Sequence, residues 1–220
     1  MKKVLTVLII SILCVSLAWA LSACGKKQEP ADEQPAQEAQ PTQQETIGNP
    51  IVQFEFHTGD VITVELFAKE APVTVINFLQ YVAEDFYKGT VIHRVSTNVV
   101  QGGGYVYRNG TYEAKAATHD PIVGEFASNN KTNNVSHTAG TISMARTSNN
   151  KNSATSQFFF CPVDSTGWDG DYAAFGRVVD ESSLAAIKRM SNVQHRASMS
   201  DGSGEPIDAI IIKSVKILQQ

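Results

Sequence analysis

The chain has 220 residues, of which 42% are hydrophobic and 18% charged, a composition typical of one soluble domain with some additional chain. Its 18 basic and 22 acidic residues give a net charge of −4, so it lacks the basic excess that neutralises nucleic-acid phosphates, and we expect no nucleic-acid partner. The three cysteines, Cys14, Cys24 and Cys161, lie in such different surroundings that a disulfide framework or a zinc cluster is excluded.

The N-terminus has the pattern of a secretion signal. Two lysines precede an apolar run over residues 4–20, and Leu21-Ser22-Ala23-Cys24 follows. Small residues ahead of a cysteine resemble the bacterial lipobox, in which the signal is cleaved before the cysteine and that thiol carries the lipid. We therefore expect residues 1–23 to be a lipoprotein signal peptide and Cys24 to be lipidated, for example with palmitate. The protein would then be anchored in the bacterial cell membrane and face the extracytoplasmic side.

A plain transmembrane anchor is the alternative for this segment. Its roughly 17 apolar residues are at the lower limit for spanning a bilayer, so a cleaved signal is the preferred interpretation. Residues 28–46 contain only Gln, Glu, Asp, Pro, Ala and Thr, with no large side chain to bury. Residues 24–48 are therefore predicted to be the lipidated cysteine and a disordered tether, and residues 49–220 the folded domain.

The folded domain begins with a predicted hairpin and a helix. Residues 51–56 and 61–66 alternate between apolar and polar side chains around Thr58-Gly59-Asp60, the pattern of two strands and a turn. Pro72 is tolerated in a first helical turn, and apolar residues follow it at near-helical spacing. The apolar face of this helix is predicted to contain Val73, Ile76, Phe78, Leu79 and Val82.

The rest of the chain contains further strands and one more helix. Leu184, Ile187 and Met190 predict a second helix after Ser182-Ser183. About eight strands and two helices result, without regular alternation of strand and helix. Closure into an antiparallel barrel is favoured over a parallel sheet, because closure removes exposed strand edges. The later strands are predicted at residues 91–95, 99–101, 141–145, 157–161, 172–179 and 209–217.

A histidine and an arginine stand side by side in one predicted strand. His93-Arg94 lies in an apolar run, and Gln101-Gly102-Gly103-Gly104 follows. An arginine in a strand more often points to solvent. The glycine run lacks a following helix and a Lys-Ser/Thr pair, so phosphate binding is disfavoured.

A second candidate motif is the aromatic strand at residues 157–161. Alternation places Gln157, Phe159 and Cys161 on one face and Phe158 and Phe160 on the other. If one face lines a groove, the Gln157 amide could hold a peptide backbone while the Phe159 ring receives an apolar side chain. A core strand with one stray amide is the alternative.

Other catalytic classes lack their residues. Asp164, Asp169 and Asp171 have the wrong spacing for a calcium loop, so a turn is predicted there. The five histidines show no paired spacing, and no Gly-x-Ser-x-Gly elbow is present. Hydrolase and metal-centre functions are therefore disfavoured.

Five motifs taken in order resemble the cyclophilin-type peptidyl-prolyl isomerases, over most of residues 51–217. The resemblance implies a mainly β fold, a closed eight-stranded antiparallel barrel with two capping helices, and a substrate groove on its outer face. Residues 49–220 would then be an isomerase domain. The motifs are His93-Arg94, Gln101-Gly102-Gly103, and the segments 140–146, 156–159 and 174–178.

The resemblance also implies the reaction, rotation about the bond preceding proline, with Arg94 stabilising the twisted amide. It implies clients that are proline-containing polypeptides, secreted or surface proteins folding outside the cytoplasm, and it requires no cofactor; we expect a monomer. Catalytic roles are implied for Arg94, Gln157, Phe159 and His93, and substrate binding for Gln101, Val99, Ala145, Arg146, Trp168 and Tyr172.

The sequence departs from the family pattern around the groove. The segment from His93 to Gln101 is one residue shorter than usual and lacks the Phe and Met that wall the proline pocket, so Val99, with Asn98 or Val100, must replace them. Two alternatives therefore remain open. One is a catalytically weak, chaperone-like module that holds proline-containing segments, and the other is a structural lipoprotein with a vestigial groove.

Overall fold

The computed structural model of the chain describes residues 48–219, so the predicted signal peptide, Cys24 and the tether before Gly48 lie outside the described residues. Neither α-helix among residues 48–219 is long and apolar enough to cross a membrane. The elements in chain order are β1 (Ile51–Phe56), β2 (Val61–Leu66), α1 (Pro72–Ala83), β3 (Thr90–Ser96), β4 (Val99–Arg108), β5 (Thr111–Ala114), the 3-10 turn η1 (Ala127–Asn129), β6 (Thr141–Met144), β7 (Phe158–Phe160), the 3-10 turn η2 (Thr166–Trp168), β8 (Ala174–Val178), α2 (Glu181–Ser191), β9 (His195–Ala197), β10 (Gly204–Pro206) and β11 (Ile210–Gln219).

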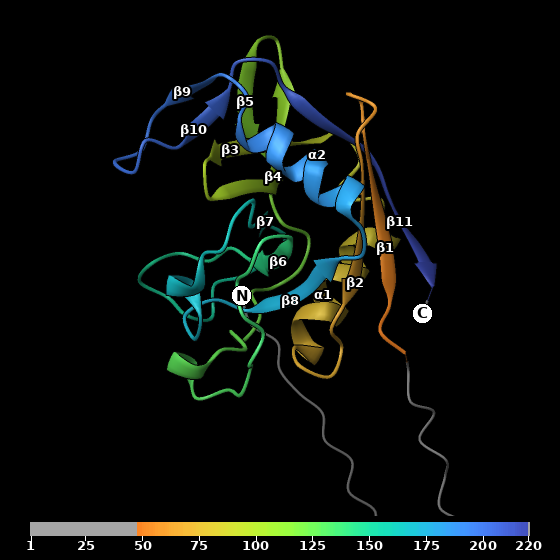
Figure 1. Cartoon of the computed structure of the whole chain (residues 1–220), viewed down its shortest axis with the longest axis vertical. Helices are drawn as coiled ribbons and strands as arrows, with labels where there is room; N and C mark the ends of the chain where they lie inside the picture. The colour runs from red at the N-terminus through yellow and green to blue at the C-terminus, as the bar shows by residue number, and fades with distance from the viewer. Residues whose placement is uncertain (1–47, 220) are drawn as a thin grey trace, which may run out of the picture. The chain divides into compact units, whose positions relative to one another are not determined.

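Eight of the strands close into a barrel (Figure 1). Neighbours follow the order β4-β7-β6-β8-β2-β1-β11-β3, and β3 pairs back with β4, every pair being antiparallel. β5 pairs with β4 outside this ring, while β10 pairs with β3 and β9 with β10. The predicted closed eight-stranded antiparallel barrel with two helices is confirmed.

The barrel strands lie where the alternating patterns predicted them, but β4 runs past its predicted end at Gln101. Gly102, Gly103 and Gly104 continue the strand because they let β7 and the chain before it come close. A Cβ at Gly103, where φ is +84°, would lie 2.8 Å from the Ser156 carbonyl oxygen, and one at Gly104 would overlap the Gln157 side chain. β5, β9 and β10 were not predicted, since these short strands have no apolar alternation.

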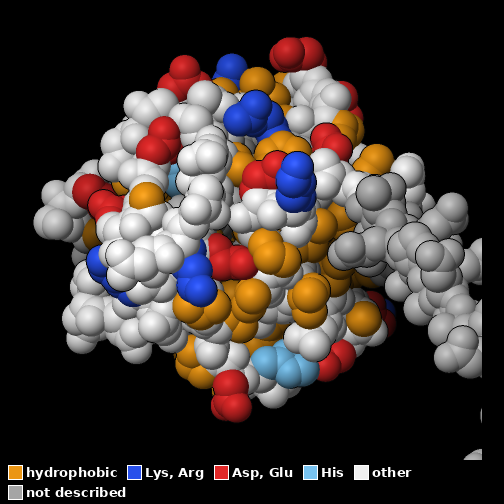
Figure 2. All heavy atoms as spheres, turned by 90° about the horizontal axis from the view of Figure 1, so that it is seen from below, with side chains coloured by type: hydrophobic (Ala, Val, Ile, Leu, Met, Phe, Trp, Pro, Cys, Tyr) orange, Lys and Arg blue, Asp and Glu red, His pale blue; other side chains and the backbone are white. Residues whose placement is uncertain are grey.

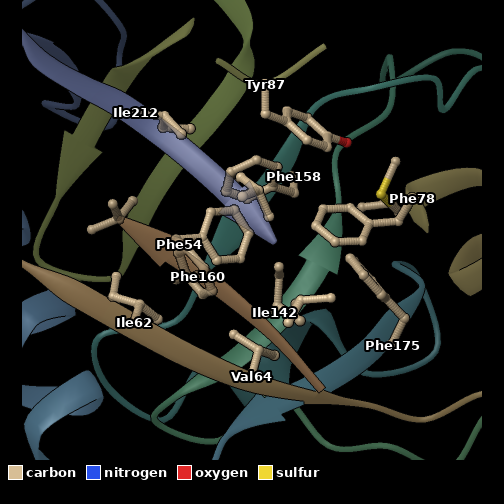
Figure 3. Close-up of a cluster of buried hydrophobic side chains, with 14 of the residues drawn as sticks. Phe54, Ile62, Val64, Phe78, Tyr87, Ile142, Phe158, Phe160, Phe175 and Ile212 are labelled. Carbon is tan, nitrogen blue, oxygen red and sulfur yellow. The ribbon is translucent and has the colours of Figure 1, made fainter. Parts of the chain in front are cut away.

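The barrel interior is packed with aromatic rings from both sheet and helix (Figure 3). Phe54 lies at the centre of this group, with ring-centroid distances of 5.2 Å to Phe158 and 5.5 Å to Phe160. From α1, Phe78 reaches within 5.3 Å of Phe175. Each fully buried ring of this kind contributes about 1.5–3 kcal/mol to folding, so the interior holds the barrel that carries the outer-face residues.

The buried face of α1 differs from the prediction. Val73 and Ile76 are 39% and 59% exposed, while the polar Thr74 and Asn77 are buried. The reason is that the buried Glu125 carboxylate accepts hydrogen bonds from the backbone N–H of Thr74 (2.8 Å) and from its hydroxyl (2.7 Å). Asn77 Nδ2 likewise donates to a backbone carbonyl (2.7 Å). These bonds satisfy the polar groups inside and turn the two aliphatic side chains outward.

The lower end of the domain as drawn in Figure 1, where α1 lies, is turned toward the viewer in Figure 2. Hydrophobic side chains gather over the middle of this face, with acidic and basic side chains around them. α2 lies in the upper half of Figure 1. It begins at Glu181, since the Asp180 carboxylate accepts a hydrogen bond from the Ser183 N–H (2.7 Å) and caps the helix.

Candidate active site

Three neighbouring strands place the predicted site residues in one row. Gln101 on β4 pairs with Arg94 on β3 and with Phe159 on β7. Val100 and Phe158, the alternate residues, are buried in the barrel core, so the three side chains belong to the outer face. Phe158 and Phe160 lie inside and Phe159 and Cys161 outside, as the alternation predicted.

A groove of about 370 Å³ lies over this row. The six residues predicted to bind substrate, and both Arg94 and Phe159, line it. Of the residues expected to replace the usual pocket wall, Asn98 and Val99 line the groove, whereas Val100 is in the core. The full lining is Arg94, Asn98, Val99, Gln101, Ala145, Arg146, Phe159, Trp168, Tyr172 and Asp201.

The polar side of the groove is organised around the Arg94 guanidinium. Its Nη1 donates to Gln101 Oε1 (3.1 Å), its Nε to Ser203 Oγ (2.8 Å) and its Nη2 to Asp201 Oδ2 (2.7 Å). Gln101 Nε2 in turn donates to Gln157 Oε1 (3.0 Å). The guanidinium side chain is 26% exposed, so it is fixed by three partners while one part of it still faces the groove.

The apolar side of the groove is built on the Phe159 ring. Trp168 and Tyr172 meet this ring edge-on, at centroid distances of 5.2 and 5.7 Å. Val99 and Ala145 pack in the same cluster. Such a floor with aromatic walls accepts a small apolar ring or side chain.

Arg146 closes the rim next to these rings. Its guanidinium carbon lies 4.7 Å from the centre of the Tyr172 ring, and its Nε donates to the Asp171 carbonyl (3.0 Å). This arrangement orients Tyr172 by a cation–π contact.

Behind the floor, a buried histidine supports Phe159. The His137 ring is nearly parallel to Phe159, at 6.0 Å and 10°. Its Nδ1 lies 2.8 Å from Asp169 Oδ1 and its Nε2 3.0 Å from Ser143 Oγ. Burial lowers the pKa of His137, although Asp169 acts in the opposite direction. This Ser-His-Asp order is that of a hydrolytic triad, but Ser143 is fully buried, so no substrate reaches it and the array positions the floor.

Two predicted catalytic residues lie beside the groove and do not line it. Gln157 lies over Gly104 and contacts the groove through Gln101. The His93 ring packs 4.3 Å from the Tyr105 ring, and its buried Nδ1 has no hydrogen-bond partner within the described residues. Burial lowers the pKa of His93 to about 4, so the ring is neutral at pH 7.

The single cysteine of the described region lies under the groove. Cys161 is buried, and burial raises the pKa of its thiol to about 12. The thiol therefore stays protonated and packs as an apolar group. Within residues 48–219, no group of three or more His, Cys, Asp or Glu side chains is placed to hold a metal ion.

Sequence reasoning missed Asp201 and Ser203 at Arg94, and Asp169 and His137 behind Phe159. Asp201 and Ser203 are more than 100 residues from Arg94 in sequence, in a polar segment with no periodic signal. His137 and Asp169 are separated by 32 residues, so no local spacing indicates their pairing.

Comparison with known proteins is consistent over the whole described domain. Residues 51–217 match the family model described as "Cyclophilin type peptidyl-prolyl cis-trans isomerase/CLD". A peptidyl-prolyl cis-trans isomerase of Acinetobacter baylyi is 37% identical over 67% of this chain and 74% of its own length. A peptidyl-prolyl cis-trans isomerase A of Dickeya dadantii is 38% identical over 72% of this chain and 80% of its own. A crystal structure of a Cryptosporidium parvum cyclophilin-type isomerase, in the presence of the dipeptide Ala-Pro, superposes with a TM-score of 0.61 at 25% identity and covers 77% of this chain and 99% of that one.

Proposed function

The chain belongs to the cyclophilin-type peptidyl-prolyl cis-trans isomerases, and we propose that it performs this isomerisation in the groove lined by Arg94 and Phe159. The reaction turns the peptide bond before a proline through a barrier of roughly 18–20 kcal/mol. No covalent bond breaks. Catalysis therefore consists of binding the twisted amide more tightly than either planar form.

Arg94 supplies the group that stabilises the twisted amide. A guanidinium has five N–H donors, and three of those on Arg94 are used by Gln101, Ser203 and Asp201. The remaining two are on Nη1 and Nη2. When the amide twists, the proline nitrogen lone pair becomes localised and accepts a hydrogen bond from a donor that is already oriented.

The other groove residues hold the substrate in place. Phe159, with Trp168 and Tyr172 around it, provides the apolar floor for the proline ring. The amides of Gln101 and Gln157 provide donors and acceptors for the peptide backbone on either side. Proline-containing peptides are the ligand class we propose, a choice supported by the solved relative studied in the presence of Ala-Pro.

The observation that carries this proposal is a triply held guanidinium beside an aromatic floor. The test is the kcat/KM for isomerisation of an X-Pro peptide by the full chain and by its Arg94→Ala variant. Removing a preoriented donor of this kind costs about 10²- to 10³-fold, and we expect a loss of that size. Arg189→Ala is the matched control, because Arg189 pairs with Asp60 and does not line the groove. Equal activity of Arg94→Ala and wild type, with both folded, would contradict the proposal.

We also propose that the enzyme acts outside the cytoplasm, anchored through a lipid on Cys24. The support is the lipobox-like Leu21-Ser22-Ala23-Cys24 after an apolar run, and the polar, small-residue stretch at 28–46. Its clients are then secreted or surface proteins that pass the membrane unfolded. Growth with a labelled fatty acid should label the wild type and leave Cys24→Ser unlabelled. Equal labelling of the two would contradict the anchor.

A binding module is the second candidate function, and one observation favours it. The Asp201 carboxylate lies 2.7 Å from the guanidinium and partly neutralises the charge that catalysis requires. A module of this kind would hold proline-containing peptides with measurable affinity and give no rate enhancement. Titration of the same X-Pro peptide, alongside the rate measurement, separates the two functions.

A further inference from the structure

The hairpin formed by β9 and β10 brings its tip to Arg94. β10 pairs with β3 at Gly204 and Val95, the residue after Arg94. A Cβ at Gly204 would overlap the backbone carbonyl of Arg196 on β9, so only glycine permits this close pairing. A further hydrogen bond, from the Tyr112 hydroxyl to the Pro206 carbonyl (2.9 Å), ties the hairpin to β5. The hairpin tip is thereby fixed beside the groove.

Two residues of this tip form a closed ring of hydrogen bonds with the guanidinium. Arg94 Nε donates to Ser203 Oγ (2.8 Å), and the Ser203 hydroxyl donates to Asp201 Oδ1 (2.6 Å). Arg94 Nη2 donates to Asp201 Oδ2 (2.7 Å), which completes the ring. The Ser203 backbone N–H adds a bond to Asp201 Oδ1 (3.0 Å). Every member of the ring is therefore both held and holding.

We propose that Asp201 and Ser203 are positioning residues of the isomerase, which lock the Arg94 guanidinium in the orientation that the twisted amide requires. The inference rests on the catalytic role proposed for Arg94. Ser203 is fully buried and Asp201 is half-exposed in the groove wall, so one partner is rigid and the other faces the substrate side. Neither residue was assigned a role by the sequence motifs.

The physical reason is that an arginine side chain is long and flexible, so a useful donor must be held before the substrate arrives. A donor fixed in advance stabilises the transition state without reorganising during the reaction. A paired contact at Nε and Nη2 fixes the plane of the guanidinium as well as its position. Gln101 alone, at Nη1, would leave the plane free to rotate.

The ionisation state of Asp201 suits this role at all physiological pH values. Hydrogen bonds from Ser203, followed by the Arg94 guanidinium, lower the pKa of Asp201 to about 2. The carboxylate thus remains an acceptor for both neighbours. It also places a negative charge beside the catalytic cation, so loss of the carboxylate has two opposite effects: a looser guanidinium and a higher local positive potential. We expect the loss of orientation to dominate.

Asp201→Asn is the sharpest variant. An asparagine amide has one acceptor oxygen and one donor nitrogen, and Asp201 has donors on both sides, namely Arg94 at Oδ2 and Ser203 at Oδ1. Either orientation of the amide places its NH₂ against a donor, so the ring opens with almost no change in volume. Ser203→Ala opens the ring at its other member. Because Ser203 is buried, Asp201→Asn carries the test if Ser203→Ala fails to fold.

The experiment measures kcat and KM separately for the full chain. Misplacing a catalytic group by about 1 Å can cost 10²-fold, and we expect Asp201→Asn to lower kcat about tenfold while KM stays within about twofold of wild type. Asp60→Asn is the control, since it breaks the exposed Asp60–Arg189 pair outside the groove. Unchanged or raised kcat in Asp201→Asn would overturn the inference, and unchanged kcat in Arg94→Ala would instead overturn the proposed function.

A spectroscopic readout separates positioning from a general effect on stability. The Nε–H of Arg94, assigned by its loss in Arg94→Lys, should give a sharp, slowly exchanging ¹H–¹⁵N signal in the wild type because Ser203 accepts it. In Asp201→Asn the signal should shift and exchange faster, whereas it should be unchanged in Asp60→Asn. A signal that is identical in Asp201→Asn and wild type would contradict positioning even if kcat fell.

Discussion

Arg94 and Phe159 lie on the two strands that flank β4, and both are paired with the same residue, Gln101. A fixed cation and an apolar floor are thereby brought to the two sides of one groove. This is the pair of properties that isomerisation of a prolyl bond requires, because the ring must be held while its nitrogen receives a hydrogen bond.

Phe159→Ala should weaken substrate binding more than it slows the bound reaction. The variant removes the ring against which Trp168 and Tyr172 pack, so the proline ring loses its floor. Loss of such a contact is worth about 10- to 100-fold in kcat/KM, and we expect it mainly as a higher KM. Steady-state kinetics on an X-Pro peptide measure this, with Val163→Ala as an exposed control. A fall in kcat at constant KM would contradict the role of Phe159 as floor.

Gly104→Ala should reduce activity by displacing Gln157. A Cβ at this position overlaps the Gln157 side chain, whose amide is hydrogen-bonded to Gln101 in the groove. We expect kcat/KM to fall about tenfold, as for other groups displaced by about 1 Å. Gly48→Ala has open space around its Cβ and is the control. Wild-type activity in Gly104→Ala would show that the position of Gln157 is unimportant.

Glu125→Gln should destabilise the domain and leave isomerisation unchanged. The carboxylate accepts hydrogen bonds from Val73 N–H (3.1 Å) and from Thr74, so it caps the N-terminus of α1 from a distant segment. Loss of an N-cap costs about 0.5–2 kcal/mol, which chemical denaturation would show as a lower midpoint. Glu70→Gln is the exposed control. A full-strength fold in Glu125→Gln would mean that the cap contributes nothing.

The buried His93 should make stability depend on pH. Its folded-state pKa of about 4 is below the ordinary value of 6.5, so the unfolded chain binds more protons between these values. The free energy of unfolding should therefore fall as the pH falls from 6.5 to about 4, and this contribution should not change further below pH 4. His93→Phe, which keeps an aromatic ring against Tyr105, should show a shallower fall over that window in denaturation experiments. An identical pH profile would contradict the burial of a neutral imidazole.

The barrel could be predicted because its strands alternate visibly, as in β1 and β2, where polar side chains separate buried apolar ones. The exposed face of α1 could not, since the inward turn of Thr74 depends on Glu125, 51 residues away. Propensity and periodicity carry no information about such a partner.

The groove could be predicted only in part, for the same reason. Residues in ordered motifs, such as Gln101 and Phe159, are found in the groove. Ser203 and Asp201 are reached through a hairpin that has no hydrophobic alternation, and their function follows from contacts with Arg94. Long-range polar contacts of this kind are visible only in the folded chain.

The central claim, that this groove isomerises prolyl bonds, is tested most directly by NMR exchange on an X-Pro peptide with a substoichiometric amount of the full chain. Exchange between the cis and trans signals should appear within seconds in the wild type, against tens of seconds or more without enzyme, and should be lost in Arg94→Ala. Peptide signals that shift on binding to the folded wild type, with no exchange between cis and trans, would contradict the account and identify a binding module.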